Sequence, residues 1–258
     1  VLNQTEGEVY INGISLRENP VEAKKHIGFL PQKPPLYGDL TVDEYLVYCA
    51  NLRLMDKSKI REAVDKAKER CGIMHFSNRL IRNLSGGYQQ RVGIAQAIVH
   101  NPKFVVLDEP TNGLDPNQIL EIRELIKEIA TDHSVLLSTH ILSEVQATCS
   151  YIRMIEHGNV VFTGTMEEFN NYVKPDSFII YANNLPSTEI LTSIEGIKSV
   201  EELGAKKYRI HFEGERETMQ RLIEESVKNN WELSEITLDK SSLEEVFAQL
   251  SGKRKPKA

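Results

Sequence analysis

Apolar and polar residues alternate along the first two-thirds of the chain with two distinct periods. Compact apolar runs bounded by polar or glycine-containing segments predict strands, and apolar residues spaced three and four apart predict helices. The strands expected from this pattern lie within residues 7–13, 26–32, 104–107, 134–138, 151–156 and 159–162, and the first of them is expected to end in an Asn-Gly turn. Helices are expected to begin at Thr41, Lys57, Ser85, Pro116 and Thr165. Strands interleaved with helices in this way indicate an α/β fold.

Two of these helix starts also carry capping chemistry. Thr41-Val42-Asp43-Glu44 has the spacing of a capping box, in which the first and fourth residues bond reciprocally through side chain and backbone. Pro116 suits a first helical turn, and the isoleucines at 119, 122, 126 and 129 then form one apolar stripe. The helix over 57–71 is heavily charged, and we expect its charges to form a solvated face.

The pattern restarts after Lys174-Pro175-Asp176, which we interpret as a linker. Beyond it the expected order is strand 178–181, helix 187–194, strand 197–203, strand 208–212, helix 215–229 and strand 231–238. This β-α-β-β-α-β order is that of a small α+β ferredoxin-like domain. A last helix is expected to open at Ser241, and the basic tail 251–258 is expected to be a solvated end.

The stretch Phe104-Val105-Val106-Leu107-Asp108-Glu109 carries the first candidate chemistry. Its apolar part predicts a buried strand, and two carboxylates stand at the carboxyl end, where ligands bind in open α/β sheets. Phosphate chemistry can use such a pair, because one carboxylate holds Mg²⁺ and the next polarises a water. The alternative is an ordinary strand that ends in a solvated acidic turn.

Ser85-Gly86-Gly87 opens the helix that precedes this strand. Ser85 suits an N-cap, and the two glycines let the backbone approach a ligand closely. Backbone N–H groups and the helix dipole would then face an anion. The structural alternative is a plain capped helix.

His140 follows the strand 134–138. A lone histidine is usually structural, but one placed beside such an acidic strand can donate to a γ-phosphate. His140 and Glu144 also have the i, i+4 spacing of a metal-binding pair, although no third ligand candidate accompanies them.

These stretches, in this order, resemble the nucleotide-binding domain of ABC ATPases. Ser85-Gly86-Gly87 resembles the signature motif, 104–109 the Walker B motif, Leu114-Asp115 the D-loop and His140 the switch histidine. Gln32, at the end of the strand 26–32, resembles the glutamine of the Q-loop. The resemblance covers roughly the first two-thirds of the chain.

The resemblance implies a role for each matched residue. Asp108 would hold Mg²⁺ with Gln32, Glu109 would be the general base, and His140 would contact the γ-phosphate. Ser85, Gly86 and Gly87 would bind ATP held by the opposite protomer, and Asp115 would couple the two sites. Two protomers, identical or not, would thus enclose two ATP molecules.

The family resembled here powers transport across a membrane through a permease subunit. The part beyond residue 176 looks like the C-terminal extension of the exporter-type branch, so we expect export from the cytoplasmic face of the cell membrane. Alternatives are a soluble ABC ATPase of DNA repair or translation, and a non-catalytic regulatory module.

The family's Walker A loop, G-x-x-x-x-G-K-[ST], is the one motif that the 258 residues do not contain. We therefore expect a fragment: a partial ABC ATPase domain over 1–173, with a helical subdomain at about 41–103, and an accessory domain over 176–250. The fold class expected is a P-loop NTPase-like ABC domain without its N-terminal P-loop unit. This chain alone is expected to be inactive, whereas its parent would hydrolyse ATP.

The net charge bears on the class of partner, and the cysteines bear on the cellular compartment. The net charge of −6 gives no global signal for nucleic acid. Cys49, Cys71 and Cys149 are odd in number and far apart, which favours small buried hydrophobes in a reducing compartment over disulfides or metal ligands. The expected protein is cytoplasmic and reaches the membrane through its permease.

Overall fold

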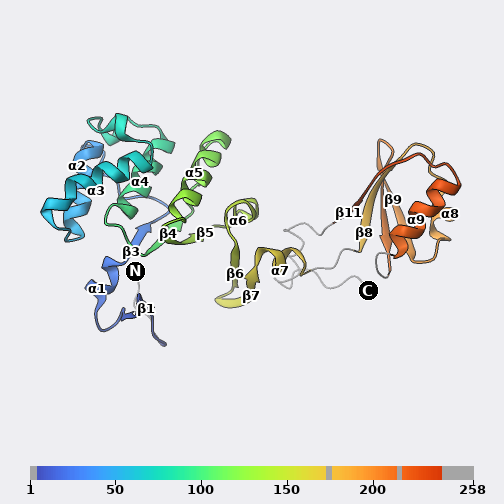
Figure 1. Ribbon diagram of the computed structural model, residues 1–258, viewed down its shortest axis with the longest axis horizontal. Helices are drawn as coiled ribbons and strands as arrows, with labels where there is room; N and C mark the ends of the chain where they lie inside the picture. The colour runs from blue at the N-terminus through green and yellow to red at the C-terminus, as the bar shows by residue number, and fades with distance from the viewer. Residues whose placement is uncertain (1–4, 173–175, 214–216, 240–258) are drawn as a thin grey trace. The chain divides into compact units, whose positions relative to one another are not determined.

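The computed structural model describes residues 5–172, 176–213 and 217–239. The chain divides into two compact units, Val1–Cys149 and Ser150–Ala258, whose elements are labelled in Figure 1. The division after Cys149 comes earlier in the chain than the linker expected at 174–176.

The first unit is built on a three-stranded parallel sheet in the order β3-β4-β5. Its strands are β3 (Ile27–Leu30), β4 (Phe104–Asp108) and β5 (Ser134–Ser138). Leu30 lies opposite Leu107, and Leu107 lies opposite Leu137, so the three strands end at the same level of the sheet. All three carboxyl ends therefore meet at one edge of the sheet.

Six α-helices are described in this unit, and most begin where the sequence predicts. They are α1 (Pro20–Lys25), α2 (Val42–Leu52), α3 (Lys57–Arg70), α4 (Gly86–Ile98), α5 (Pro116–Ile129) and α6 (Leu142–Thr148). The predicted capping box at Thr41 is confirmed, with both reciprocal bonds present. The pattern did not predict α1 or α6.

The first strand expected from the sequence is part of a hairpin. The expected strand is short, β1 (Tyr10–Ile11), and the expected Asn-Gly turn leads into a second strand, β2 (Ile14–Ser15), that pairs with it antiparallel. Asn12 and Gly13 between them both have positive φ, of 51° and 76°. This is the backbone that an Asn-Gly hairpin turn adopts.

Helices α2, α3 and α4 contact one another, and α4 packs against β3 and β4 (Figure 1). Gly28 on β3 makes this approach possible, since a Cβ there would lie 2.2 Å from the carbonyl oxygen of Ala97 on α4. Any larger residue at 28 would push the helix from the sheet. Two short 3₁₀ turns, Met74–Phe76 and Ile81–Asn83, lead into α4.

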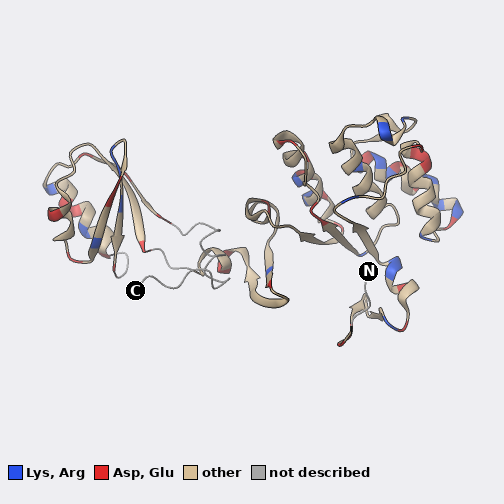
Figure 2. Cartoon of the chain, turned by 180° about the vertical axis from the view of Figure 1, so that it is seen from behind, with Lys and Arg blue, Asp and Glu red and all other residues tan. Residues whose placement is uncertain are grey.

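The charges of α3 are not all on a solvated face. Figure 2 shows positive and negative residues interspersed along the helices of this unit. Most of the charged residues of α3 are exposed, but the side chain of Lys68 is fully buried. Its ammonium lies 2.5 Å from Asp43 of α2 and 2.9 Å from Asp65. Burial would raise the pKa of Asp43, but hydrogen bonds from Lys68 and Arg61 outweigh it and lower that pKa. The buried ion pair ties α2 to α3.

His100, just after α4, should make the first unit sensitive to acid. Burial, together with the nearby charge of Arg53, lowers the pKa of His100 to about 4, against about 6.5 in an unfolded chain. The unfolded state therefore binds the proton first, and stability should fall as the pH decreases from about 6.5 to about 4. At one pKa unit per ~1.4 kcal/mol, the loss is at most about 3 kcal/mol.

Urea unfolding of His100→Gln across this pH window checks the expectation. Glutamine can still donate to the carbonyl of Ile27, which lies 3.1 Å from the imidazole Nε2 of His100. The variant should show a shallower pH dependence of the unfolding free energy. An unchanged slope would assign the acid sensitivity to other groups.

The second unit contains a hairpin and a four-stranded sheet, which we describe separately. The hairpin is formed by β6 (Tyr151–Glu156) and β7 (Asn159–Thr165), and it is followed by α7 (Met166–Asn170). Thr165 caps α7 with a capping box, so this helix begins where the sequence predicts. Met154 and Phe169 are the buried residues of its small core.

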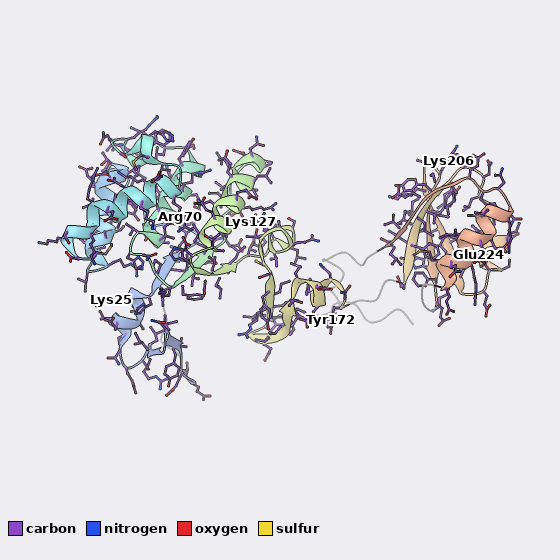
Figure 3. The ribbon with its side chains drawn as sticks, viewed as in Figure 1. Lys25, Arg70, Lys127, Tyr172, Lys206 and Glu224 are labelled. Carbon is purple, nitrogen blue, oxygen red and sulfur yellow. The ribbon has the colours of Figure 1, made fainter. Side chains whose placement is uncertain are left out.

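The four-stranded sheet has the order β11-β8-β10-β9, with every neighbouring pair antiparallel. Its elements follow the chain as β8 (Ser177–Ala182), α8 (Thr188–Thr192), β9 (Ile197–Gly204), β10 (Lys207–Phe212), α9 (Glu217–Lys228) and β11 (Leu233–Leu238). Figure 3 labels Glu224 on α9 and Lys206, which donates to Asn183. Phe178, Leu222 and Trp231 belong to the core of this sheet.

The remaining points concern the C-terminal segment, the cysteines and the length of the helices. The helix expected from Ser241 and the tail 251–258 lie outside the described residues. All three cysteines are free thiols; Cys71 is buried, and the other two are half-buried. Within the described ranges, no helix is long and apolar enough to cross a membrane.

Candidate functional site

The carboxyl edge of the β3-β4-β5 sheet collects the polar residues that the sequence singled out. Gln32 follows β3 and is exposed, and Asp108 is the last residue of β4. Glu109 comes directly after β4, and His140 lies two residues beyond the end of β5. The in-step parallel strands place these four residues at the same edge.

Both carboxylate oxygens of Glu109 are held by the segment after β5. Oε1 accepts from the backbone N–H of His140 at 3.1 Å and lies 2.7 Å from the imidazole Nδ1. Oε2 accepts from the hydroxyl of Thr139 at 3.3 Å. The Glu109 side chain is only 13% exposed, so it is fixed against the sheet edge while still reached by solvent.

The backbone of Glu109 has an unusual conformation. Its φ is +48°. This value lies in the left-handed region that side-chain-bearing residues seldom occupy. The backbone N–H of Glu109 donates to the carbonyl of Ser138 at 2.8 Å, and its carbonyl accepts from Asn112 at 3.1 Å. These bonds hold the turn that directs the carboxylate toward His140.

His140 has the opposite exposure, since its side chain is 75% exposed. The hydrogen bond to Glu109, reinforced by the charge of that carboxylate, raises the pKa of His140 above its usual value. The imidazole Nε2 is left facing away from this bond. In the proposed metal pair with Glu144 the two side chains would converge, but the Glu144 carboxylate instead accepts from Thr111.

The metal site expected from Asp108 and Gln32 has a suitable donor set. A carboxylate and a side-chain amide oxygen are the hard ligands that Mg²⁺ takes, and this ion usually keeps waters and substrate phosphates as its other ligands. Among the described residues, no group of three or more potential metal ligands is present. Two protein ligands therefore fit Mg²⁺ and do not fit an all-protein cage.

The start of α4 is open to a ligand. Ser85 occupies the N-cap position with extended backbone, but its hydroxyl makes no capping bond. The first N–H groups of a helix have no partner within it, so those of Gly86 and Gly87 can bind an anion. Nothing lies within 4 Å of a Cβ added at Gly86, whereas at Gly87 it would lie 2.7 Å from Gln118 Cδ.

The two glycines therefore differ. Gly86 is exposed, but Gly87 is buried against the first turn of α5. Gly86 is therefore the glycine of this pair that faces solvent. Asp115, expected to couple two sites, is the N-cap of α5 and accepts from the backbone N–H groups of Asn117 and Gln118 at 3.0 Å each.

Sequence reasoning missed two hydrogen bonds at this edge. The hydroxyl of Thr139, the residue before His140, donates to the Glu109 carboxylate. Thr111 and Glu144, which are both 2% exposed, form a buried hydrogen bond directly behind the site. A threonine beside a matched histidine was a signal available for the first, whereas the second requires the fold.

Known proteins are similar to this chain in sequence and in fold. The family model described as ABC transporter matches residues 1–112. The lipopolysaccharide export system ATP-binding protein LptB of Haemophilus influenzae is 34% identical over 175 residues, which make up 66% of this chain and 73% of LptB. The chain belongs to the ABC transporter ATP-binding proteins.

Other members of the ABC family extend the match. The bacitracin transport ATP-binding protein BcrA of Bacillus licheniformis is 29% identical over 98% of this chain and 81% of its own length. The solved structure of cbiO1 from Clostridium perfringens, described as part of the ABC transporter complex cbiONQ, has a TM-score of 0.60 and 28% identity. That likeness covers 67% of this chain and 71% of cbiO1. The ABC ATP-binding fold is thereby shown.

Proposed function

We propose that this chain is the catalytic part of an ATP-hydrolysing subunit that drives an ABC transporter. The observation that carries the proposal is the Glu109 carboxylate, held at the carboxyl edge of a parallel sheet by His140 and Thr139. A carboxylate fixed beside open space can orient a water for in-line attack on a γ-phosphate. Phosphoryl transfer depends mainly on such positioning and on charge stabilisation.

Each residue of the edge has a role in this proposal. Glu109 accepts the proton of the attacking water, and His140 uses the Nε2 that faces away from Glu109 to donate to the γ-phosphate. Asp108 and Gln32 would hold Mg²⁺, which when bound neutralises charge on the phosphates. Gln32, as an exposed residue just after β3, can also reach the water.

The start of α4 is proposed to act across a dimer. The free Ser85 hydroxyl and the open N–H groups of Gly86 and Gly87 would bind the γ-phosphate of ATP held by the opposite protomer. Gln118 joins the start of α4 to the first turn of α5, which Asp115 caps, so movement of one helix start would be felt by the other. Two protomers would then enclose two ATP molecules.

The wider setting is also a proposal. A permease subunit would anchor the protein at the cytoplasmic face of the membrane, and export is favoured because LptB belongs to a system named for export. Residues 1–173 would form the ABC part, with a helical subdomain at about 41–103. The antiparallel order β11-β8-β10-β9 supports a ferredoxin-like accessory domain over 176–250.

The 258 residues contain no Walker A loop, so we propose that hydrolysis needs one from outside them. Titration calorimetry of this chain alone should show no micromolar binding of MgATP, because the lysine and amide cradle for the phosphates is missing. A Walker A-bearing form, in which a Walker A segment of an ABC ATP-binding protein precedes these residues, should bind and hydrolyse MgATP.

Each result has a counterpart that would contradict the proposal. Micromolar MgATP binding by this chain alone would show that the phosphates are held elsewhere. A Walker A-bearing form that binds MgATP without turnover would favour the regulatory module, and stimulation of turnover by DNA or RNA would favour an ABC ATPase of repair or translation.

A further inference from the structure

A buried polar cluster lies directly behind the candidate site, between the segment after β4 and helices α5 and α6. Glu144 on α6 and Thr111 are each 2% exposed, and the Thr111 hydroxyl donates to Glu144 Oε1. Arg123 on α5 brings its guanidinium Nη2 to 3.9 Å from the same oxygen. None of these three residues has a part in the proposed chemistry.

The cluster is not optimised for stability. An ionised carboxylate that is removed from water is costly unless it is paired and hydrogen-bonded. Here the cation stands 3.9 Å away, and in the described structure Arg123 Nε and the Thr148 hydroxyl are buried without a hydrogen-bond partner. Well-packed apolar residues of similar volume often stabilise a fold at least as well as a buried ion pair. The arrangement therefore indicates a role other than stabilising the fold.

The positions of its members indicate that role. Thr111 follows Glu109 by two residues, inside the turn in which Asn112 N–H bonds the Glu109 carbonyl. Glu144 lies in the first turn of α6, four residues after His140. The hydrogen bond between Thr111 and Glu144 therefore closes a ring whose other link is the contact between Glu109 and His140. Movement of α6 would shift the imidazole relative to the carboxylate.

We propose that Glu144 is a positioning residue for ATP hydrolysis. It acts through Thr111 and α6 and keeps the Glu109 carboxylate and the His140 imidazole in their relative positions. The inference rests on the proposed function, since it assigns a task in the same reaction. Arg123 balances the buried charge and carries the link to α5, whose first turn Asp115 caps. The site is thus supported from behind by a bond across 33 residues of sequence.

Thr111→Val tests the link, because valine keeps the shape of threonine and removes only the hydroxyl. In the Walker A-bearing form, kcat should fall about 10- to 100-fold, the range expected when reacting groups are misplaced by about 1 Å. The KM for ATP should change less than about 3-fold, since the Thr111 side chain is buried and its hydroxyl is bonded to Glu144. Thr111→Ser, which retains the hydroxyl, should restore most of the turnover.

A second readout needs no nucleotide. In this chain alone, the ¹⁵N chemical shifts of the His140 imidazole at fixed pH report its hydrogen bond with Glu109. They should change in Thr111→Val and return in Thr111→Ser. If Thr111→Val does not fold, Thr111→Val/Glu144→Gln replaces it, since a buried amide is cheaper to leave unpaired than a carboxylate. The double variant should show the same changes.

Thr165→Val is the matched control, because it removes a threonine–glutamate hydrogen bond at the start of α7 in the other unit. It should leave kcat and the His140 shifts unchanged. Normal kcat and unchanged His140 shifts in a folded Thr111→Val variant would overturn the inference. The cluster would then have a structural role only. A Walker A-bearing form without ATPase activity would instead overturn the proposed function, while the shifts would still test the link.

Discussion

Glu109→Gln in the Walker A-bearing form should lose turnover by at least ~10²-fold, the lower end of the contribution of a general base. Gln keeps the size of the side chain, and its amide oxygen can still accept from the backbone N–H of His140. The fold of the edge should therefore persist, and the variant should bind MgATP normally. In the proposed dimer, hydrolysis is the step that separates the protomers, so an ATP-bound dimer of the variant should accumulate.

Steady-state hydrolysis and size-exclusion chromatography with MgATP measure the two effects. Glu124→Gln is a suitable control, since Glu124 is an exposed carboxylate on α5 whose partner is Lys127. It should leave both turnover and association unchanged. Near-normal turnover of Glu109→Gln would assign the proton acceptor elsewhere, with His140 as the next candidate.

Gly86→Asp should abolish ATP-dependent dimerisation without weakening the fold. Nothing lies within 4 Å of a Cβ at this position, so the new side chain meets no group of its own protomer. A carboxylate in the first turn of α4 also suits the helix dipole, and the melting temperature should stay the same or rise. Across the dimer the same charge would face the γ-phosphate and repel it.

Analytical ultracentrifugation with MgATP, in the Glu109→Gln background, separates the two effects of the substitution. Gly86→Asn has the same shape without the charge, so it should retain more dimer than Gly86→Asp. Gly87 is less suitable for this test, because a side chain there would first displace Gln118 of α5. A dimer that persists in Gly86→Asp would mean that the start of α4 is only a helix cap.

The parts of the fold that sequence predicted are those whose signals are local. The capping box of Thr41 and the apolar run 134–138 each specify an element within a few residues, and α2 and β5 begin where expected. Lys68 was predicted to be solvated because its partner Asp43 lies 25 residues earlier in the chain. Helix α6 was missed since it is short and has no side-chain cap.

In the candidate site, too, the sequence predicts what depends on local signals and misses contacts between distant residues. The meeting of Gln32, Asp108 and His140 at one edge could be expected, because parallel strands end together. The direct bond between Glu109 and His140 spans 31 residues, and the pairing of Thr111 with Glu144 spans 33. Such contacts depend on how α5 and α6 pack, and this packing cannot be predicted from the residue pattern along the chain.

The left-handed backbone of Glu109 implies a conflict between folding and activity at this one position. A residue with a side chain gives up about 1–2 kcal/mol in this conformation, and only glycine adopts it freely. Glycine at 109 would therefore relax the turn and has no carboxylate to offer. The residue that the proposed reaction needs is the one that the backbone disfavours, which is the trade-off expected where strain is stored at a functional site. Selection for thermostability alone would thus drive residue 109 away from glutamate.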